Sequence, residues 1–180
     1  MSHDIPATGT APDDPPEQME TPLSQMGWLA DRFVERVPGV TRILLGTSDG
    51  LLLLQNSNMG KDTADSVAAN ISSQFSLGCG IPGPDGQLLP PTQILMERPD
   101  CLLFVMVAGR GHAAAFSHHP EEHRGGMVDT VLGVFADPDA EPGVIAYEMG
   151  LLIKQFAHIM QTPVRRGEHG VTAAGASDTP

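Results

Sequence analysis

The chain has 180 residues, 41% of them hydrophobic and 18% charged, and carries a formal net charge of −12 at pH 7. This length favours one domain with a substantial core. Nucleic acids and anionic membrane surfaces both require a basic surface, so the acidic balance argues against either partner. No apolar run approaches the about 20 residues of a membrane span, which argues against membrane insertion.

The cysteine content and the N-terminal composition predict a cytoplasmic protein. Cys79 and Cys101 are the only cysteines. They are too few for a disulfide framework and lack a redox C-x-x-C spacing, so we expect both thiols to be reduced. Residues 1–22 contain no Lys or Arg and no apolar core, and therefore lack the pattern of a signal peptide.

Both ends of the chain differ in composition from its body. Residues 1–22 are acidic and rich in proline, so they cannot bury enough apolar surface to offset the entropy of ordering, and we predict a disordered tail. Residues 163–180 are rich in Gly, Ala, Thr and Ser and are predicted to form a flexible tail. The folded domain is therefore expected over residues 23–162.

The first part of this body predicts a helix and a hairpin. Apolar residues at helical spacing over Leu23–Val37 predict the helix, with Thr21 as its N-cap, Pro22 in its first turn and a stop at Pro38-Gly39. Two strands, Val40–Gly46 and Leu51–Gln55, flank Thr47-Ser48-Asp49-Gly50. Asp-Gly between two apolar runs favours a tight hairpin.

The rest of the body continues with a middle helix, three strands and a last helix. The middle helix is expected over Lys61–Leu77, ended by Gly78, and a loop rich in Gly and Pro follows up to Pro90. The further elements are strands at Pro91–Glu97, Cys101–Ala108 and Met127–Ala136, and a helix at Pro142–Gln161. The short connections predict an α+β fold with an antiparallel sheet, in the order α-β-β-α-β-β-β-α.

Three short motifs match catalytic or nucleotide-binding patterns in the wrong context. Gly46–Gly50 fits the nucleophile elbow around Ser48, but a strand follows it where the elbow needs a helix. Gly78–Gly83 fits G-x-G-x-x-G, but it closes a helix instead of opening one. Gly60–Thr63 lacks the first glycine of a phosphate-binding loop. We therefore predict no enzyme, no catalytic residue and no cofactor; a hydrolase using Ser48 is the alternative.

Four of the seven histidines cluster before the last strand. They are His112, His118, His119 and His123. His119 and His123 have the i, i+4 spacing of a helical metal site, but two such residues supply only half of a tetrahedral shell. Pro120 and the glycines at 125–126 favour a mobile exposed loop over residues 112–126, with no metal bound.

The middle helix and the third strand carry features of a homodimer interface. Small uncharged residues occupy part of the helix where a solvated face usually carries Lys and Glu. The strand lacks the charge that normally protects an exposed edge. The predicted interface residues are Ser66, Ala69, Asn70, Ser73, Ser76, Thr92, Ile94 and Met96. The alternative is a monomer whose third strand is covered by residues 81–91.

Four segments, in the same order along the chain, resemble bacterial roadblock-type domains, a family named after a dynein light chain. They are Met26–Val40, Ser48–Leu53, Leu102–Met106 and Gly143–Met149. The resemblance covers residues 23–162 and is strongest to the roadblock proteins of conservons. These operons also encode a sensor-kinase-like protein and a small Ras-like GTPase.

The resemblance implies a fold, an assembly and a function. The fold is a five-stranded antiparallel sheet with the middle helix on one face and the terminal helices on the other. The assembly is a homodimer in which middle helices pair and third strands join two sheets. The function is a non-catalytic regulatory or scaffold module that binds a small Ras-like GTPase, and relatives that stimulate GTPases reshape them without donating an arginine. The alternative is a structural adaptor for the sensor-kinase-like protein alone.

Overall fold

The computed structural model describes residues 21–112 and 126–161. Within these residues, three helices and five strands follow the order that the sequence predicts. The elements are α1 (Pro22–Arg36), β1 (Val40–Thr47), β2 (Leu52–Gln55), α2 (Lys61–Cys79), β3 (Gln93–Glu97), β4 (Leu102–His112), β5 (Met127–Ala136) and α3 (Pro142–Gln161). The predictions made for residues 1–20, for His118, His119 and His123, and for residues 163–180 lie outside the described residues.

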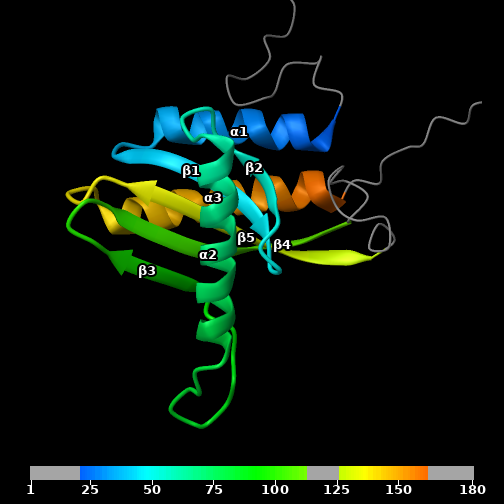
Figure 1. Cartoon of the computed structure of the whole chain (residues 1–180), viewed down its shortest axis with the longest axis vertical. Helices are drawn as coiled ribbons and strands as arrows, with labels where there is room; N and C mark the ends of the chain where they lie inside the picture. Colours follow the sequence, from blue (N-terminus) through cyan, green and yellow to red (C-terminus); the bar gives the residue numbers. More distant parts are fainter. Residues whose placement is uncertain (1–20, 113–125, 162–180) are drawn as a thin grey trace, which may run out of the picture.

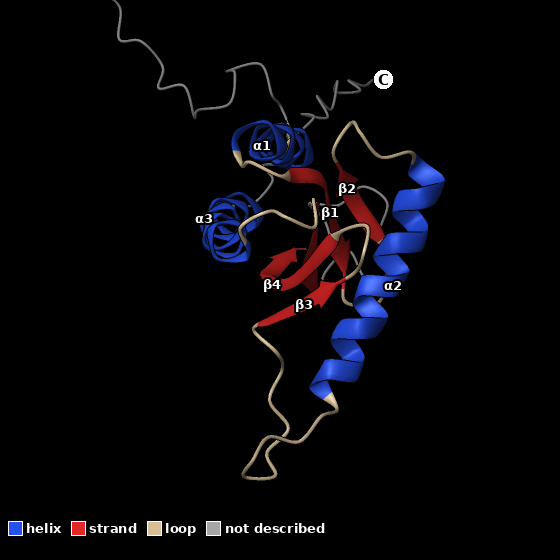
Figure 2. Cartoon of the chain, turned by 90° about the vertical axis from the view of Figure 1, so that its left-hand side faces the viewer, coloured by secondary structure: helices blue, strands red, loops and turns tan. Residues whose placement is uncertain are grey.

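The five strands form one antiparallel sheet with the order β2-β1-β5-β4-β3. α1 and α3 cover one face of this sheet, and α2 crosses the other face (Figures 1 and 2). Among the described residues, β2 and β3 are the two edge strands. The predicted α+β fold class is confirmed, including the placement of the middle helix opposite the two terminal helices.

Alternation along the strands divides the core between the two faces. In β4, Leu102 and Phe104 pack toward α1 and α3, whereas Leu103 and Val105 pack toward α2. Successive side chains of a strand point to opposite faces, so a continuous apolar run serves a sheet that is covered on both sides. The cluster on the α2 face consists of Leu44, Met59, Ala64, Ala68, Ile71, Leu103, Val105 and Val131.

The start of α1 follows the predicted capping pattern. Thr21 Oγ1 accepts a hydrogen bond from the Ser24 N–H at 3.1 Å, and Ser24 Oγ accepts one from the Thr21 N–H at 3.3 Å. This reciprocal pair satisfies two donors that the first helical turn leaves without partners. The turn after α1 requires Gly39, whose φ is +81°, a conformation that other residues adopt only with strain.

The end of α2 differs from the prediction. The helix continues two residues beyond Leu77, through Gly78 to Cys79. Gly78 is therefore not the helix stop; it allows a close contact. A Cβ atom at this position would lie 2.9 Å from Pro91 Cγ and 3.4 Å from Ile94 Cδ1, so only glycine lets the end of α2 approach β3 this closely.

The hairpin of β4 and β5 is also longer than the sequence predicts. β4 extends past Ala108 to His112, which pairs with Met127 of β5. His112 was predicted to begin a loop and is instead part of the strand. The extension begins at Gly109, where the register shifts and φ is +96°. A bulge of this kind lets a strand continue while its direction changes.

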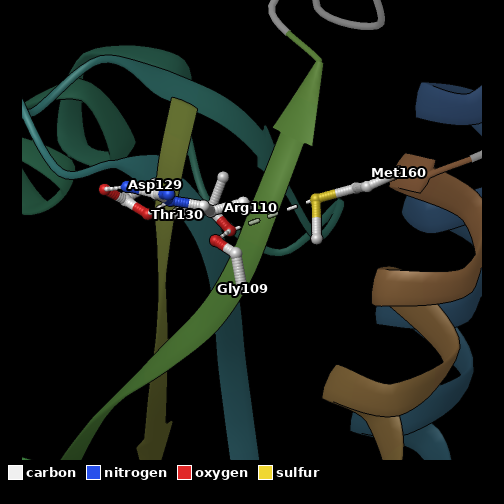
Figure 3. A network of polar contacts seen from close by, with 5 residues as sticks. All are labelled: Gly109, Arg110, Asp129, Thr130 and Met160. Atoms are coloured by element: carbon white, nitrogen blue, oxygen red, sulfur yellow. Dashed lines mark hydrogen bonds and ion pairs between the residues drawn. The ribbon is translucent and has the colours of Figure 1, made fainter. Parts of the chain in front are cut away.

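Polar contacts fix the bulge (Figure 3). The buried Thr130 Oγ1 donates to the Gly109 carbonyl oxygen at 3.0 Å and lies 4.0 Å from Met160 Sδ on α3. One residue further along, Arg110 Nε donates to Asp129 Oδ1 across the strands at 2.6 Å. This ion pair is exposed and contributes little stability, whereas the buried Thr130 hydroxyl is satisfied by the Gly109 carbonyl and so does not carry the cost of an unpaired polar group.

We predict that Gly39→Ala lowers the free energy of unfolding more than Gly86→Ala does. Both glycines have positive φ, but a Cβ at Gly39 would lie 2.6 Å from Ala140 Cβ, whereas nothing lies within 4 Å at Gly86. The Gly39 variant adds a steric clash to backbone strain and should lose about 2–4 kcal/mol, against about 1 kcal/mol for the control. Urea unfolding measures both losses; equal losses would contradict the packing described for Gly39.

Candidate interaction surface

The outward face of α2 is exposed, small and uncharged. All five residues predicted there are exposed: Ser66, Ala69, Asn70, Ser73 and Ser76. Two of their polar groups are already satisfied, because Asn70 Nδ2 donates to the Ser66 carbonyl at 2.7 Å and Ser73 Oγ donates to the Ala69 carbonyl at 2.8 Å. Burial of this face against a partner would therefore leave few donors without acceptors.

The charges of α2 are confined to its beginning. Lys61 Nζ lies 2.7 Å from Asp65 Oδ2, one turn away. This hydrogen bond raises the pKa of the fully exposed Lys61 ammonium, because the carboxylate favours its charged form. After Asp65 the helix contains no charged residue. After Asp65, the outward face of α2 therefore has no charged side chain that would attract or repel the surface of a partner.

A groove of about 640 Å³ lies between α2 and the turn that joins β1 to β2. Its lining residues are Ser48, Asp49, Ala69, Ser72, Ser73, Ser76 and Leu77. The turn is held against the helix by the buried Ser72, whose Oγ donates to the carbonyl oxygens of Thr47 and Ser48. The groove is wide and is lined mostly by small side chains, so it is better suited to contact with a protein surface than to binding a polar small molecule.

Leu77 is a member of this surface that the sequence prediction assigned only to the end of the helix. Its side chain is 73% exposed, the highest value among the large hydrophobic residues described. Leu77 follows Ser73 by four residues and Asn70 by seven, so it lies on the same side of α2. Its spacing from the predicted residues was the signal that could have identified it.

β3 presents a free edge, but its side chains point to the two faces of the sheet. Ile94 and Met96 are half-buried and pack against the core on the α2 face, whereas Leu95 is 38% exposed on the opposite face. Thr92 is exposed and precedes the strand, which begins at Gln93. The edge therefore offers backbone hydrogen-bonding groups, and Ile94 and Met96 are only partly available for contacts.

The helix and strand parts of the predicted surface meet at one place. Gly78, at the end of α2, lies against Pro91 and Ile94 at the start of β3. Ser66 is on an earlier turn of the helix and does not take part in this junction. The surface is thus a strip along α2 that joins the free edge of β3 at the end of the helix.

The three sequence motifs have the local structures that argue against catalysis. Ser48 lies in the turn between β1 and β2, and its N–H donates to the Asp129 carbonyl at 2.8 Å. A strand follows it, so the hairpin interpretation is confirmed and the nucleophile elbow is absent from this turn. Gly78–Gly83 begins in the last turn of α2 and so closes a helix, and Gly60 is the N-cap of α2, with Gln55 where a phosphate-binding loop has its first glycine.

Neither a metal cluster nor a membrane span is found in the part of the chain that the structure describes. No group of three or more His, Cys, Asp and Glu residues within 21–112 and 126–161 is arranged to hold a metal ion. Three of the clustered histidines fall outside these ranges, so the predicted absence of a zinc site stays a prediction. Among the same described residues, no helix has the length and apolar character needed to cross a bilayer.

The two cysteines are free and half-buried. Burial raises the pKa of the Cys101 thiol, and the neighbouring Asp100 carboxylate raises it further, because both disfavour the thiolate. Cys101 is therefore a poor nucleophile at neutral pH.

Comparison with known proteins identifies the family. The Roadblock/LC7 domain model matches residues 26–82. A crystal structure of a Roadblock/LC7 domain from Streptomyces avermitilis is 33% identical with a TM-score of 0.59, over 76% of this chain and 98% of that one. The chain belongs to the Roadblock/LC7 family.

Other solved structures share the Roadblock/LC7 fold. A second such domain from Streptomyces avermitilis is 25% identical, with a TM-score of 0.52 over 73% of this chain and 97% of that one. MglB from Myxococcus xanthus is 14% identical, with a TM-score of 0.56 over 76% and 94% of the two chains, which shows a common fold. The comparison with curated proteins found no match.

We predict that the raised pKa of Cys101 makes the protein less stable at alkaline pH. The unfolded chain ionises this thiol first, so the free energy of unfolding falls as pH rises from about 8.5 toward the higher pKa of the folded state. Urea unfolding at pH 7 and pH 9.5 should show a larger loss for the wild type than for Cys101→Ala. Identical losses would show that burial does not raise the pKa of this thiol.

Proposed function

We propose that this Roadblock/LC7 protein is a non-catalytic regulatory or scaffold module that homodimerises and binds a small Ras-like GTPase in a cytoplasmic signalling complex. The observation that carries the dimer is the strip along α2, which is exposed and uncharged, and in which Asn70 and Ser73 already donate hydrogen bonds to carbonyls of the helix. A protein with a net charge of −12 repels its own copies unless they meet through a surface of this kind.

The free edge of β3 supports the same assembly. Its unpaired backbone groups can be satisfied by the β3 edge of a second copy, which would join two sheets into one. A two-fold axis that pairs these edges also brings the two α2 helices together, because α2 ends against the start of β3. The proposed interface comprises the residues of α2 named above, together with Thr92, Ile94 and Met96.

The GTPase partner is supported by membership of the Roadblock/LC7 family and by the conservon resemblance of the sequence. The described residues supply no nucleotide-binding loop, so the nucleotide would belong to the partner. The chain would act by contact, through a surface that spans both copies of the dimer. The second candidate is a dimeric adaptor for a sensor-kinase-like protein, with no GTPase contact.

We expect the wild type to sediment as a dimer at micromolar concentration and Ala69→Arg/Ser73→Glu to sediment as a folded monomer. Both positions are exposed, so the fold should tolerate the changes, but two long charged side chains would have to be desolvated between closely packed helices where Ala and Ser leave no room for them. Val144→Glu/Gln155→Arg, at exposed positions of α3, adds the same two charges and should leave the dimer intact. A dimer that survives Ala69→Arg/Ser73→Glu would show that the interface is elsewhere.

The GTPase contact predicts a specific capture result. Immobilised wild-type protein, incubated with lysate of its native cells containing GTPγS or GDP, should retain a Ras-like GTPase identified by mass spectrometry. The monomeric Ala69→Arg/Ser73→Glu variant should retain little of it, because the proposed surface requires both copies. Retention of a sensor-kinase-like protein without any GTPase, in both nucleotides, would favour the adaptor function instead.

A further inference from the structure

The segment between α2 and β3 is an ordered hairpin. We call residues 80–91 the α2–β3 hairpin. Pro82 and Leu88 form an antiparallel bridge, and the Gly83 N–H donates to the Gln87 carbonyl at 2.8 Å. Gly86, with φ +74°, closes the turn, and its N–H donates to the Gly83 carbonyl at 2.9 Å. These backbone bonds give the segment a defined shape within a single copy.

The hairpin exposes large apolar side chains. Leu77, at the end of α2, and Ile81, Leu88 and Leu89, in the hairpin, are 73%, 68%, 64% and 67% exposed. From Ser66 to Met96 the only charged residue is Asp85, although 18% of the chain is charged. Ordered leucines without surrounding charges are typical of a surface that is covered in the assembled protein.

The hairpin projects beyond the edge of the sheet. α2 runs across the strands and its last turns extend past β3, and the hairpin then turns back below the edge of the sheet to the start of β3 (Figures 1 and 2). Along this path α2 follows one row of the sheet. Ile71 lies over Gly133, Gly133 pairs with Val105, Val105 pairs with Ile94, and Gly78 lies against Ile94.

If two β3 edges pair through a two-fold axis, the axis determines which residues of the second copy continue this row. If the axis passes through Leu95, the middle residue of β3, then Ile94 of one copy lies opposite Met96 of the other. The line of α2 therefore continues over the row of the second copy that begins at Met96. In that row Met96 pairs with Leu103, and Leu103 pairs with Phe135. Met96 and Phe135 are only partly buried on the α2 face, so this row is an apolar surface beside the helix.

We propose that the α2–β3 hairpin is a clasp that packs onto the second copy, with Leu88 and Leu89 on the row formed by Met96, Leu103 and Phe135. This inference rests on the proposed homodimer. The two-fold axis repeats the contact, so each copy gives one hairpin and receives one. In this arrangement the exposed apolar side chains of the hairpin are buried against a second copy of this chain. The hairpin carries a single charge, Asp85, and the row that it covers is apolar and half-buried, so the two surfaces are complementary.

The test compares two pairs of exposed apolar residues. Leu88→Ser/Leu89→Ser should weaken the dimer at least about tenfold, measured by sedimentation equilibrium, because two leucines leave an apolar contact. Val144→Ser/Tyr147→Ser removes side chains that are 50% and 67% exposed on α3 and should leave the dissociation constant unchanged. Circular dichroism should show both variants to be folded.

The outcomes separate the clasp from the dimer itself. If Leu88→Ser/Leu89→Ser leaves the dissociation constant unchanged while Ala69→Arg/Ser73→Glu gives a monomer, the dimer stands and the clasp is wrong. If the wild type is a monomer at every concentration tested, the proposed dimer fails and the clasp fails with it. If the hairpin variant keeps the dimer but no longer retains the GTPase, the hairpin belongs to the surface of that partner.

A second measurement does not depend on affinity. A Leu88→Cys variant, in a Cys79→Ser/Cys101→Ser background, should react with iodoacetamide more slowly as the protein concentration rises through the dimer range. Val144→Cys in the same background should react at a constant rate. Equal rates for Leu88→Cys at low and high concentration would show that the hairpin stays in solvent in the dimer and would overturn the clasp.

Discussion

The close approach of α2 to the sheet is the constraint on which the rest of the structure depends. Three glycines make room for it: Gly46 in β1, Gly50 in the turn between β1 and β2, and Gly133 in β5. A Cβ at Gly46 would lie 3.4 Å from Ala68 Cβ, one at Gly50 would lie 3.2 Å from Ala69 Cα, and one at Gly133 would lie 3.0 Å from Ile71 Cδ1. At Gly50 an added side chain would meet the backbone of α2 and at Gly133 the end of Ile71, so larger residues at these positions would crowd the helix, because packed interiors tolerate little added volume.

The position of α2 in turn determines what the surface can do. Because α2 lies close to the sheet, it exposes only a narrow strip of small residues, and its last turns extend past the edge of β3 (Figure 2). Strip, edge and hairpin then form one continuous region that is almost free of charge. On a chain with 22 acidic and 10 basic residues, such a region is where self-association costs least electrostatic energy. The proposed dimer and the proposed clasp use this single property.

The sequence predicted the elements well where periodicity and turn chemistry agree. β5 and α3 have the bounds expected from their patterns, and the Thr21 cap and the hairpin around Ser48 are confirmed. The predictions were wrong at two glycines, one that allows a close packing contact and one that forms a bulge. Gly78 looked like a helix stop but supports contact with Pro91, and β4 passes Ala108 because Gly109 forms a bulge. Both glycines act through neighbours that are distant in sequence, which no local pattern contains.

The candidate surface divides in the same way. The sequence by itself determined that α2 carries small uncharged residues after Asp65 and that β3 lacks charge before Glu97, because composition and helical spacing are local properties. Only the tertiary structure decided that Ile94 and Met96 pack toward α2 and are partly buried, that Leu77 stands exposed beside Ser73, and that the α2–β3 hairpin projects past the sheet. The reason is physical: exposure and direction depend on which face of the sheet α2 covers and how closely it lies, and that is set by contacts between residues far apart in the chain.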